Sequence, residues 1–212
     1  MGKWKYAVTL SKGRAVKFIS HHDLARAFER MLRRSGLPYE LTEGFHKRPR
    51  ISFSPALALG LTSNCEVAII SLKEPIEPEE VRRRLAREAP RGIKVVKVER
   101  DHGRFGWLFS QALWAEYALN VEFKEAPQMA PQRMAWEIER VLGKGVRKVR
   151  LLSSEGKRVR LKVALQVVGE EAVRPSKLLE ALKGLGGPIQ LAHICRTRFL
   201  KPLEVVERGD ER

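Results

Sequence analysis

The chain has 212 residues, of which 43% are hydrophobic and 31% are charged, and its formal net charge is +16 at pH 7. This balance is typical of a globular protein with a proper core and excludes a largely disordered chain. No apolar run approaches the roughly 20 residues that span a bilayer, and the first residues enter a strand pattern rather than a signal peptide. We therefore expect a cytoplasmic protein with no membrane contact.

The first half of the chain predicts the element order β-α-β-β-α-β. Residues 3–10 alternate between apolar and polar side chains, which predicts a half-buried strand. A helix follows, and the further expected elements are a strand at 39–43, a strand at 65–72, a helix at 77–89 and a strand at 93–98. This order is the ferredoxin-like pattern.

The first predicted helix has clear start and stop signals. Ser20 is a good N-cap, and Asp23, three residues on, supplies the acid of a capping box. Apolar residues recur every three or four positions from Leu24 to Leu32, which predicts one buried stripe. Gly36 is expected to end the helix.

The second half repeats the order of elements after a Gly- and aromatic-rich connector at 101–113. Its expected elements are strands at 117–123, 146–152, 158–168 and 189–200, and helices that begin at Pro131 and Pro175. We therefore expect an α+β fold of two tandem ferredoxin-like (β-α-β-β-α-β) units. The expected units are residues 1–105 and 114–203, and a charged tail at 204–212 follows them.

Positive charge is concentrated near the start of the chain, where residues 1–54 contain twelve Lys and Arg against four Asp and Glu. Basic side chains of the first helix lie opposite its apolar stripe, and the loop at 44–50 mixes aromatic rings with cations. Because rings stack on unpaired bases while cations hold phosphates, we expect RNA as a partner. The expected contact residues are His22, Arg26, Arg30, Arg33, Phe45, His46, Lys47, Arg48 and Arg50.

The strand at 158–168 carries a second basic row. Arg158, Arg160 and Lys162 alternate with apolar residues and so share one face of the strand. If that face of the sheet is open, the row can follow a phosphate backbone and share a cationic trough with the first helix and loop. The alternative is that these side chains shield the sheet or pair with Glu122 across it.

The residues offer little for metal, cofactor or nucleophilic chemistry. His21 and His22 are adjacent and point about 100° apart on a helix, and Cys65 and Cys195 have no zinc spacing and are expected as buried thiols. There is no phosphate-cradling glycine loop, so we expect no metal and no cofactor. The catalytic candidates are His21 and His46, acting as acid and base at an RNA 2′-hydroxyl. For His21, the alternative is a hydrogen-bonded residue in the first turn of the helix.

Several short matches within residues 15–61 point to one family. The stretch from Phe18 to Leu24, the Gly44-Phe45 pair and the run from Pro49 to Phe53 resemble the radical-SAM-linked domain family, a bacterial family of unknown function. His46, Lys47 and Arg48 stand where that family has Asn-Pro-His. The matching motif residues are Ser20, His21, Asp23, Leu24, Gly44, Phe45 and Pro49.

This resemblance implies a bacterial cytosolic protein that works with a radical-SAM enzyme, on RNA or on a ribosomal component. The cysteine motif that binds the radical-SAM cluster is absent from the sequence, so the chain would be an accessory part. The first hypothesis is therefore a non-catalytic RNA-binding accessory protein. A protein-docking subunit without RNA binding and a metal-independent ribonuclease remain as alternatives.

Overall fold

The computed structural model of the chain describes residues 4–109 and 113–200. The fold is mixed α+β, and the chain divides into two compact units, Met1–Phe109 and Ser110–Arg212. No helix in the described ranges is long and apolar enough to cross a membrane. The tail expected at 204–212 lies outside the described residues.

The sheet of the first unit contains four antiparallel strands. They are β1 (Trp4–Lys12), β2 (Ile51–Phe53), β3 (Thr62–Leu72) and β4 (Ile93–Arg100). Their order is β4-β1-β3-β2, so the first strand lies between the fourth and the third. Val8 at the centre of β1 marks the register, because it faces Ala68 on one side and Val98 on the other.

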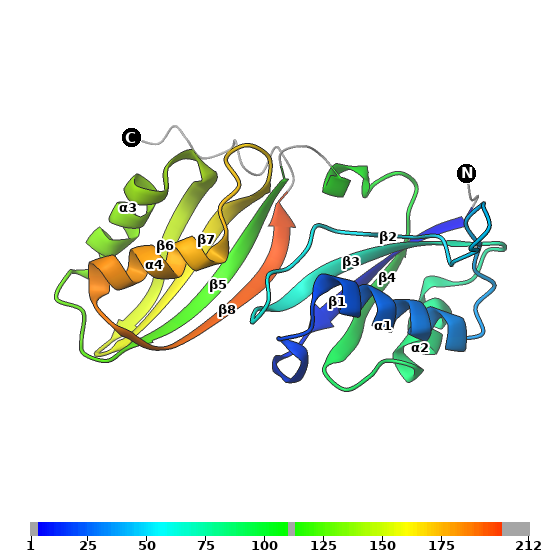
Figure 1. Cartoon of the computed structure of the whole chain (residues 1–212), viewed down its shortest axis with the longest axis horizontal. Coiled ribbons are helices and arrows are strands. Elements are labelled where there is room, and N and C mark those ends of the chain that lie inside the picture. The colour runs from blue at the N-terminus through cyan, green and yellow to red at the C-terminus, as the bar shows by residue number, and fades with distance from the viewer. Residues whose placement is uncertain (1–3, 110–112, 201–212) are drawn as a thin grey trace. The chain divides into compact units, whose positions relative to one another are not determined.

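Two helices cover one face of this sheet, α1 (His21–Arg34) and α2 (Pro78–Arg87) (Figure 1). The predicted capping box of α1 is confirmed: the Ser20 hydroxyl accepts from the Asp23 N–H at 3.1 Å, and the Asp23 carboxylate accepts from the Ser20 N–H at 3.2 Å. Pro78 opens α2 in the first helical turn, where its missing N–H costs nothing.

The core of the first unit lies between the sheet and these helices. The Tyr6 hydroxyl donates to the Ile76 carbonyl at 2.6 Å and accepts from its N–H at 2.8 Å, which fixes the connection into α2. The predicted apolar stripe of α1 is confirmed as buried from Leu24 to Leu32. Other fully buried side chains of this core are Val8, Leu10, Ala68, Ile70, Leu72, Val81 and Leu85.

The strand expected at 39–43 is wrong. Tyr39 and Leu41 form only isolated bridges, to Leu72 and Pro49 respectively. The place beside β3 is taken by β2, where Ile51 and Phe53 pack against the core. Tyr39 packs against the same core, so core contact alone does not explain why the later segment pairs with β3.

The second unit repeats this arrangement of elements. Its strands are β5 (Leu113–Phe123), β6 (Val146–Glu155), β7 (Arg158–Val168) and β8 (Ile189–Leu200), and its helices are α3 (Pro131–Leu142) and α4 (Pro175–Gly186). The strand order is β8-β5-β7-β6, and each of these pairs is antiparallel. Both helices lie on one face of the sheet (Figure 1).

Alternation along the strands builds the core of this unit. Leu119 and Phe123 on β5 and Leu161 on β7 are buried, as are Met134 on α3 and Leu178 on α4. Short 3₁₀ turns occur at Arg14–Val16, Gly106–Phe109 and Gly143–Gly145. Cys65 on β3 and Cys195 on β8 are only half-buried, so the expectation of buried thiols is wrong.

Candidate nucleic-acid interface

One side of α1 is a row of exposed basic side chains, which we call the basic face of α1: His22, Arg26, Arg30 and Arg33. Their spacing of three or four residues places them on one side of the helix, opposite the buried stripe. From His22 to Arg33 the row extends about 16 Å at 1.5 Å per residue. A row of this length can contact several successive phosphates.

The arginines of this face differ in their partners. Arg33 forms an ion pair with Glu29, one turn earlier, at 2.8 Å. Arg26 and Arg30 are exposed and form no ion pair within residues 4–109 and 113–200. Exposed pairs of the Arg33 type are weak, so all three guanidinium groups are accessible to a polyanion.

Three of the four arginines of α2 pair with carboxylates of the same helix. Arg82 pairs with Glu79 at 2.6 Å, and Arg83 and Arg84 both pair with Glu80, at 2.7 and 2.6 Å. Hydrogen bonds from Arg83 and Arg84 lower the pKa of Glu80 from 4.5 to about 2, so its carboxylate stays charged. Within the described residues, the arginines of these two helices that form no ion pair are Arg26 and Arg30 on α1 and Arg87 at the end of α2.

Residues 44–50, the basic loop, project from the first unit. The loop is closed at its base, where the Thr42 N–H donates to the Arg48 carbonyl at 2.7 Å and the Arg48 N–H donates to the Thr42 hydroxyl at 3.1 Å. Gly44 has φ +109°, which L side chains rarely adopt, and Pro49 is buried. The backbone conformation of Gly44 and the burial of Pro49 therefore give these two motif residues a structural role in the loop.

The tip of the basic loop combines an aromatic ring with cations. Phe45 is fully exposed, with a relative accessibility of 105%. His46, Lys47 and Arg48 are also exposed, and neither Lys47 nor Arg48 forms an ion pair in the part of the chain that the structure describes. Arg50 lies 3.8 Å from the Glu43 carboxylate, a long and exposed contact.

The base of the loop adjoins the end of α1. Arg33 in the last turn of the helix has a raised pKa, chiefly because it hydrogen-bonds Glu29, with a smaller effect from Tyr39. The backbone carbonyl of Glu40, the residue after Tyr39, accepts a hydrogen bond from the Arg50 N–H at 2.8 Å. The structure thus brings the C-terminal turn of α1 and the basic loop together.

An exposed aromatic residue that was not predicted as a contact residue lies at the other end of α1. Phe18 is 74% exposed, and the Lys17 ammonium lies 4.8 Å from the centroid of its ring. The sequence did indicate an exposed ring, because two apolar residues, Phe18 and Ile19, precede the N-cap, whereas a hydrophobic staple uses only one. Ile19 packs against the core, which leaves Phe18 in solvent.

The two candidate catalytic histidines lie in different surroundings. The half-buried His21 ring packs edge-on against Phe53, with centroids 5.8 Å apart, and Phe53 packs in turn on Phe28. His46 is exposed in the basic loop, and no described contact joins it to His21. Among the described residues, no group of three metal-binding side chains occurs.

The predicted row on β7 belongs to the second unit. Arg158 lies 3.4 Å from Glu122, the pairing considered as the alternative for this row, and Lys162 lies 3.4 Å from Glu116. Burial alone would raise the pKa of Glu116, but the Thr197 hydroxyl, Lys162 and Arg198 together lower it. Arg160 is exposed and has no ion pair among the residues described.

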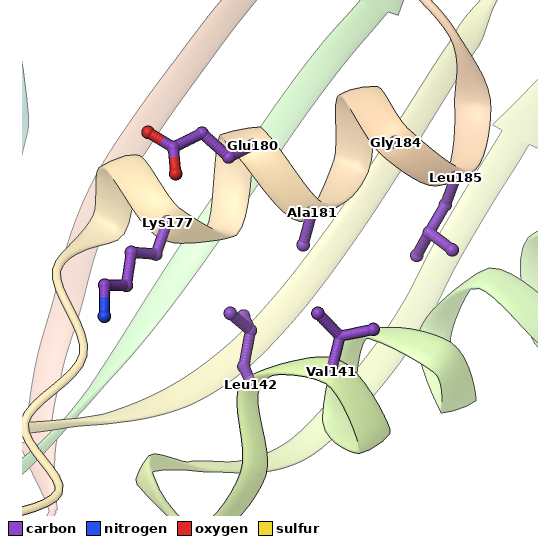
Figure 2. A pocket seen from close by; sticks show the side chains of 7 residues that line it. All are labelled: Val141, Leu142, Lys177, Glu180, Ala181, Gly184 and Leu185. Atoms are coloured by element: carbon purple, nitrogen blue, oxygen red, sulfur yellow. The ribbon is translucent and has the colours of Figure 1, made fainter.

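An apolar groove of about 480 Å³ lies between α3 and α4 of the second unit. In Figure 2, Val141 and Leu142 of α3 point toward Ala181 and Leu185 of α4. Lys177 and Glu180 supply its polar side chains, and no histidine or cysteine lines it. The groove suits contact with apolar side chains rather than catalysis.

Chains of similar fold occur among solved structures. Two of them come from an archaeal box H/ACA sRNP Nop10–Cbf5 complex and from a Cbf5–Nop10–Gar1 complex, each with a TM-score of 0.50 and 12% identity. The matches cover 90% and 92% of this chain but 46% and 48% of the matched chains, so this chain spans less than half of their length. At this identity the likeness shows the fold alone.

Comparisons of sequence give a single informative match. No curated protein matches the chain. A family model described as "Uncharacterized protein conserved in bacteria (DUF2344)" matches residues 5–180. These residues include the basic face of α1, the basic loop and the row on β7.

Proposed function

This chain belongs to the DUF2344 family of uncharacterized proteins conserved in bacteria, and we propose that it is a non-catalytic accessory protein that binds RNA through its first unit. The observation that carries the proposal is the pair of exposed, unpaired arginines on α1, Arg26 and Arg30, next to a loop with unpaired cations and an exposed ring. Cations in a row bind successive phosphates, and their release of counterions makes binding strong at low salt.

Three finer points belong to the same proposal. The order of elements, with the first strand between the fourth and the third in each sheet, supports two ferredoxin-like units. The resemblance of residues 15–61 to radical-SAM-linked domains supports a radical-SAM enzyme as the protein that this chain assists in the cytoplasm. One structural neighbour comes from an sRNP, which makes RNA a reasonable first ligand to test.

A second candidate function is a protein-docking subunit, and the groove between α3 and α4 supports it. Val141 is 55% exposed beside this groove, and apolar side chains of a partner could fill it. Cleavage of RNA by His21 or His46 has less support, because the His21 ring is packed against Phe53. Incubating labelled RNA with the protein in EDTA tests cleavage: intact RNA excludes it, and cleavage that H21A loses would support it.

The test of the proposal is fluorescence anisotropy with labelled RNA over a series of salt concentrations. The variant K47Q/R48Q removes two unpaired cations from the basic loop, and we expect it to bind RNA several-fold more weakly. The matched control R82Q/R83Q removes the same number of charges from paired positions and should bind like the wild type. Absence of RNA binding at low salt, or equal loss in both variants, would contradict the proposal.

Co-purification with and without nuclease treatment, read beside the anisotropy result, separates RNA binding from docking. A complex with a radical-SAM enzyme that survives nuclease treatment, from a protein that shows no RNA binding, would favour the docking subunit. A complex that nuclease dissolves would favour RNA as the connecting partner.

A further inference from the structure

Two phenylalanines of the first unit are exposed at opposite ends of the basic face of α1. Phe18 is 74% exposed immediately before the helix, and Phe45 is fully exposed in the basic loop, whose base adjoins the last turn. Neither ring belongs to the core of this unit. Single exposed apolar residues are common, so their neighbours decide whether they have a role.

The neighbours of both rings are cations. The Lys17 ammonium lies 4.8 Å from the Phe18 centroid. Lys47 and Arg48 follow Phe45 in the loop. Arg26 and Arg30 lie on α1, which comes between Phe18 and Phe45 in the sequence. This surface therefore has aromatic rings, on which bases can stack, on either side of cations, which can bind phosphates.

The distance along the helix sets the length of ligand that could use both ends. α1 has 14 residues and so extends about 21 Å. At 3.4 Å per stacked nucleotide, this corresponds to about six nucleotides of one strand.

The rings distinguish between the two forms of RNA. In a duplex the base faces are covered by their neighbours in the stack, so a protein surface meets phosphates, 2′-hydroxyls and base edges but no open ring face. In a single strand the bases can leave the stack and lie on an aromatic ring, which is sequence-tolerant because every base has a π-face. An exposed phenylalanine thus adds affinity for unpaired RNA and none for a duplex.

We propose that the first unit selects single-stranded RNA, with bases stacked on Phe18 and Phe45 and phosphates held by Arg26 and Arg30. This inference rests on the proposed function and specifies its ligand. A lipid surface is the other partner that exposed rings and cations could serve. It is less favoured here, because a helix that lies on a membrane inserts its apolar face, and the apolar face of α1 is buried in the core.

The experiment measures anisotropy with a labelled single strand and with the same strand annealed to its complement. The variants are F18A, F45A and the control F109A, which removes another exposed ring of this unit, 52% accessible and outside the basic face of α1. Because all three rings are exposed, thermal melting should be unchanged. A parallel measurement uses vesicles that contain phosphatidylserine.

We expect the wild type and F109A to prefer the single strand. F18A and F45A should each weaken single-strand binding about fivefold or more and leave duplex binding unchanged. Equal affinity for both forms, or F45A behaving like F109A, would overturn the selectivity but leave RNA binding through the cations intact. Binding to neither form would overturn the proposed function as well. Vesicle binding that F18A and F45A abolish, without strand preference, would assign the rings to a lipid surface and also overturn the inference.

Discussion

Replacing Arg26 and Arg30 by glutamine tests directly whether the basic face of α1 contacts phosphate. Both side chains are exposed and form no ion pair in the described residues, so R26Q/R30Q removes two charges and disturbs no packing. The slope of log K against log salt is about −0.7 per phosphate contacted on a single strand. If each arginine contacts one phosphate, the slope should become shallower by about 1.4.

This change in slope gives a specific ratio of affinities. Over a fourfold increase in salt, the wild type should lose about sevenfold more affinity than R26Q/R30Q, because four to the power 1.4 is about seven. The assay is anisotropy with one labelled RNA at a series of KCl concentrations. The comparison uses only the slope of log K against log salt for each protein, so a difference in the active fraction of two preparations has little effect on the result.

The control R82Q/R83Q separates local charge from total charge. It lowers the formal net charge by the same two units as R26Q/R30Q, from +16 to +14. Its arginines are already paired with Glu79 and Glu80, so its slope should equal that of the wild type. Equal slopes for the two double variants, or a wild-type slope for R26Q/R30Q, would refute the assignment of phosphate contacts to α1.

Two further predictions concern stability. S20A should lower the free energy of unfolding by about 1 kcal/mol near neutral pH through loss of the N-cap. Hydrogen bonds from Ser20 lower the pKa of Asp23 below 3.8 in the folded state. Their contribution to stability is therefore present above that value and is lost as the pH falls through the folded pKa. In urea unfolding, the difference in unfolding free energy between the wild type and S20A should become smaller in acid, and a difference that grows would contradict this. G145A should destabilise the second unit by about 1–3 kcal/mol, because a Cβ there would meet the Glu171 carbonyl and Val173. Gly184 is exposed on α4 beside the groove with α3, and a Cβ there meets nothing within 4 Å. G184A should therefore stabilise the helix by about 0.5–1 kcal/mol; equal effects of the two substitutions in urea unfolding would contradict the packing argument.

Elements defined by neighbours in the chain were predictable. The capping contacts of Ser20 and Asp23 span three residues, and the buried stripe from Leu24 to Leu32 spans little more than two turns. The ion pairs of α2 also join residues three or four apart. These interactions are local, so their spacing in the sequence is sufficient to predict them.

Choices between competing segments were not predictable. The segment at 39–43 alternates like a strand, yet it forms only isolated bridges and Ile51–Phe53 pairs with β3, although Tyr39 also packs against the core. The connection between Arg34 and Glu88, 54 residues apart, likewise depends on how the helices pack. Both outcomes require comparing segments that only the folded chain brings together.

The sequence by itself determined where the positive charge and the aromatic residues of this protein occur, and how α1 begins and which side of it is buried. Only the tertiary structure decided that Arg26 and Arg30 form no ion pair among the described residues, that Phe45 and Phe18 are exposed, and that the basic loop adjoins the end of α1. The physical reason is range: helix periodicity and capping act over a few residues, whereas exposure and pairing depend on which distant segments come into contact.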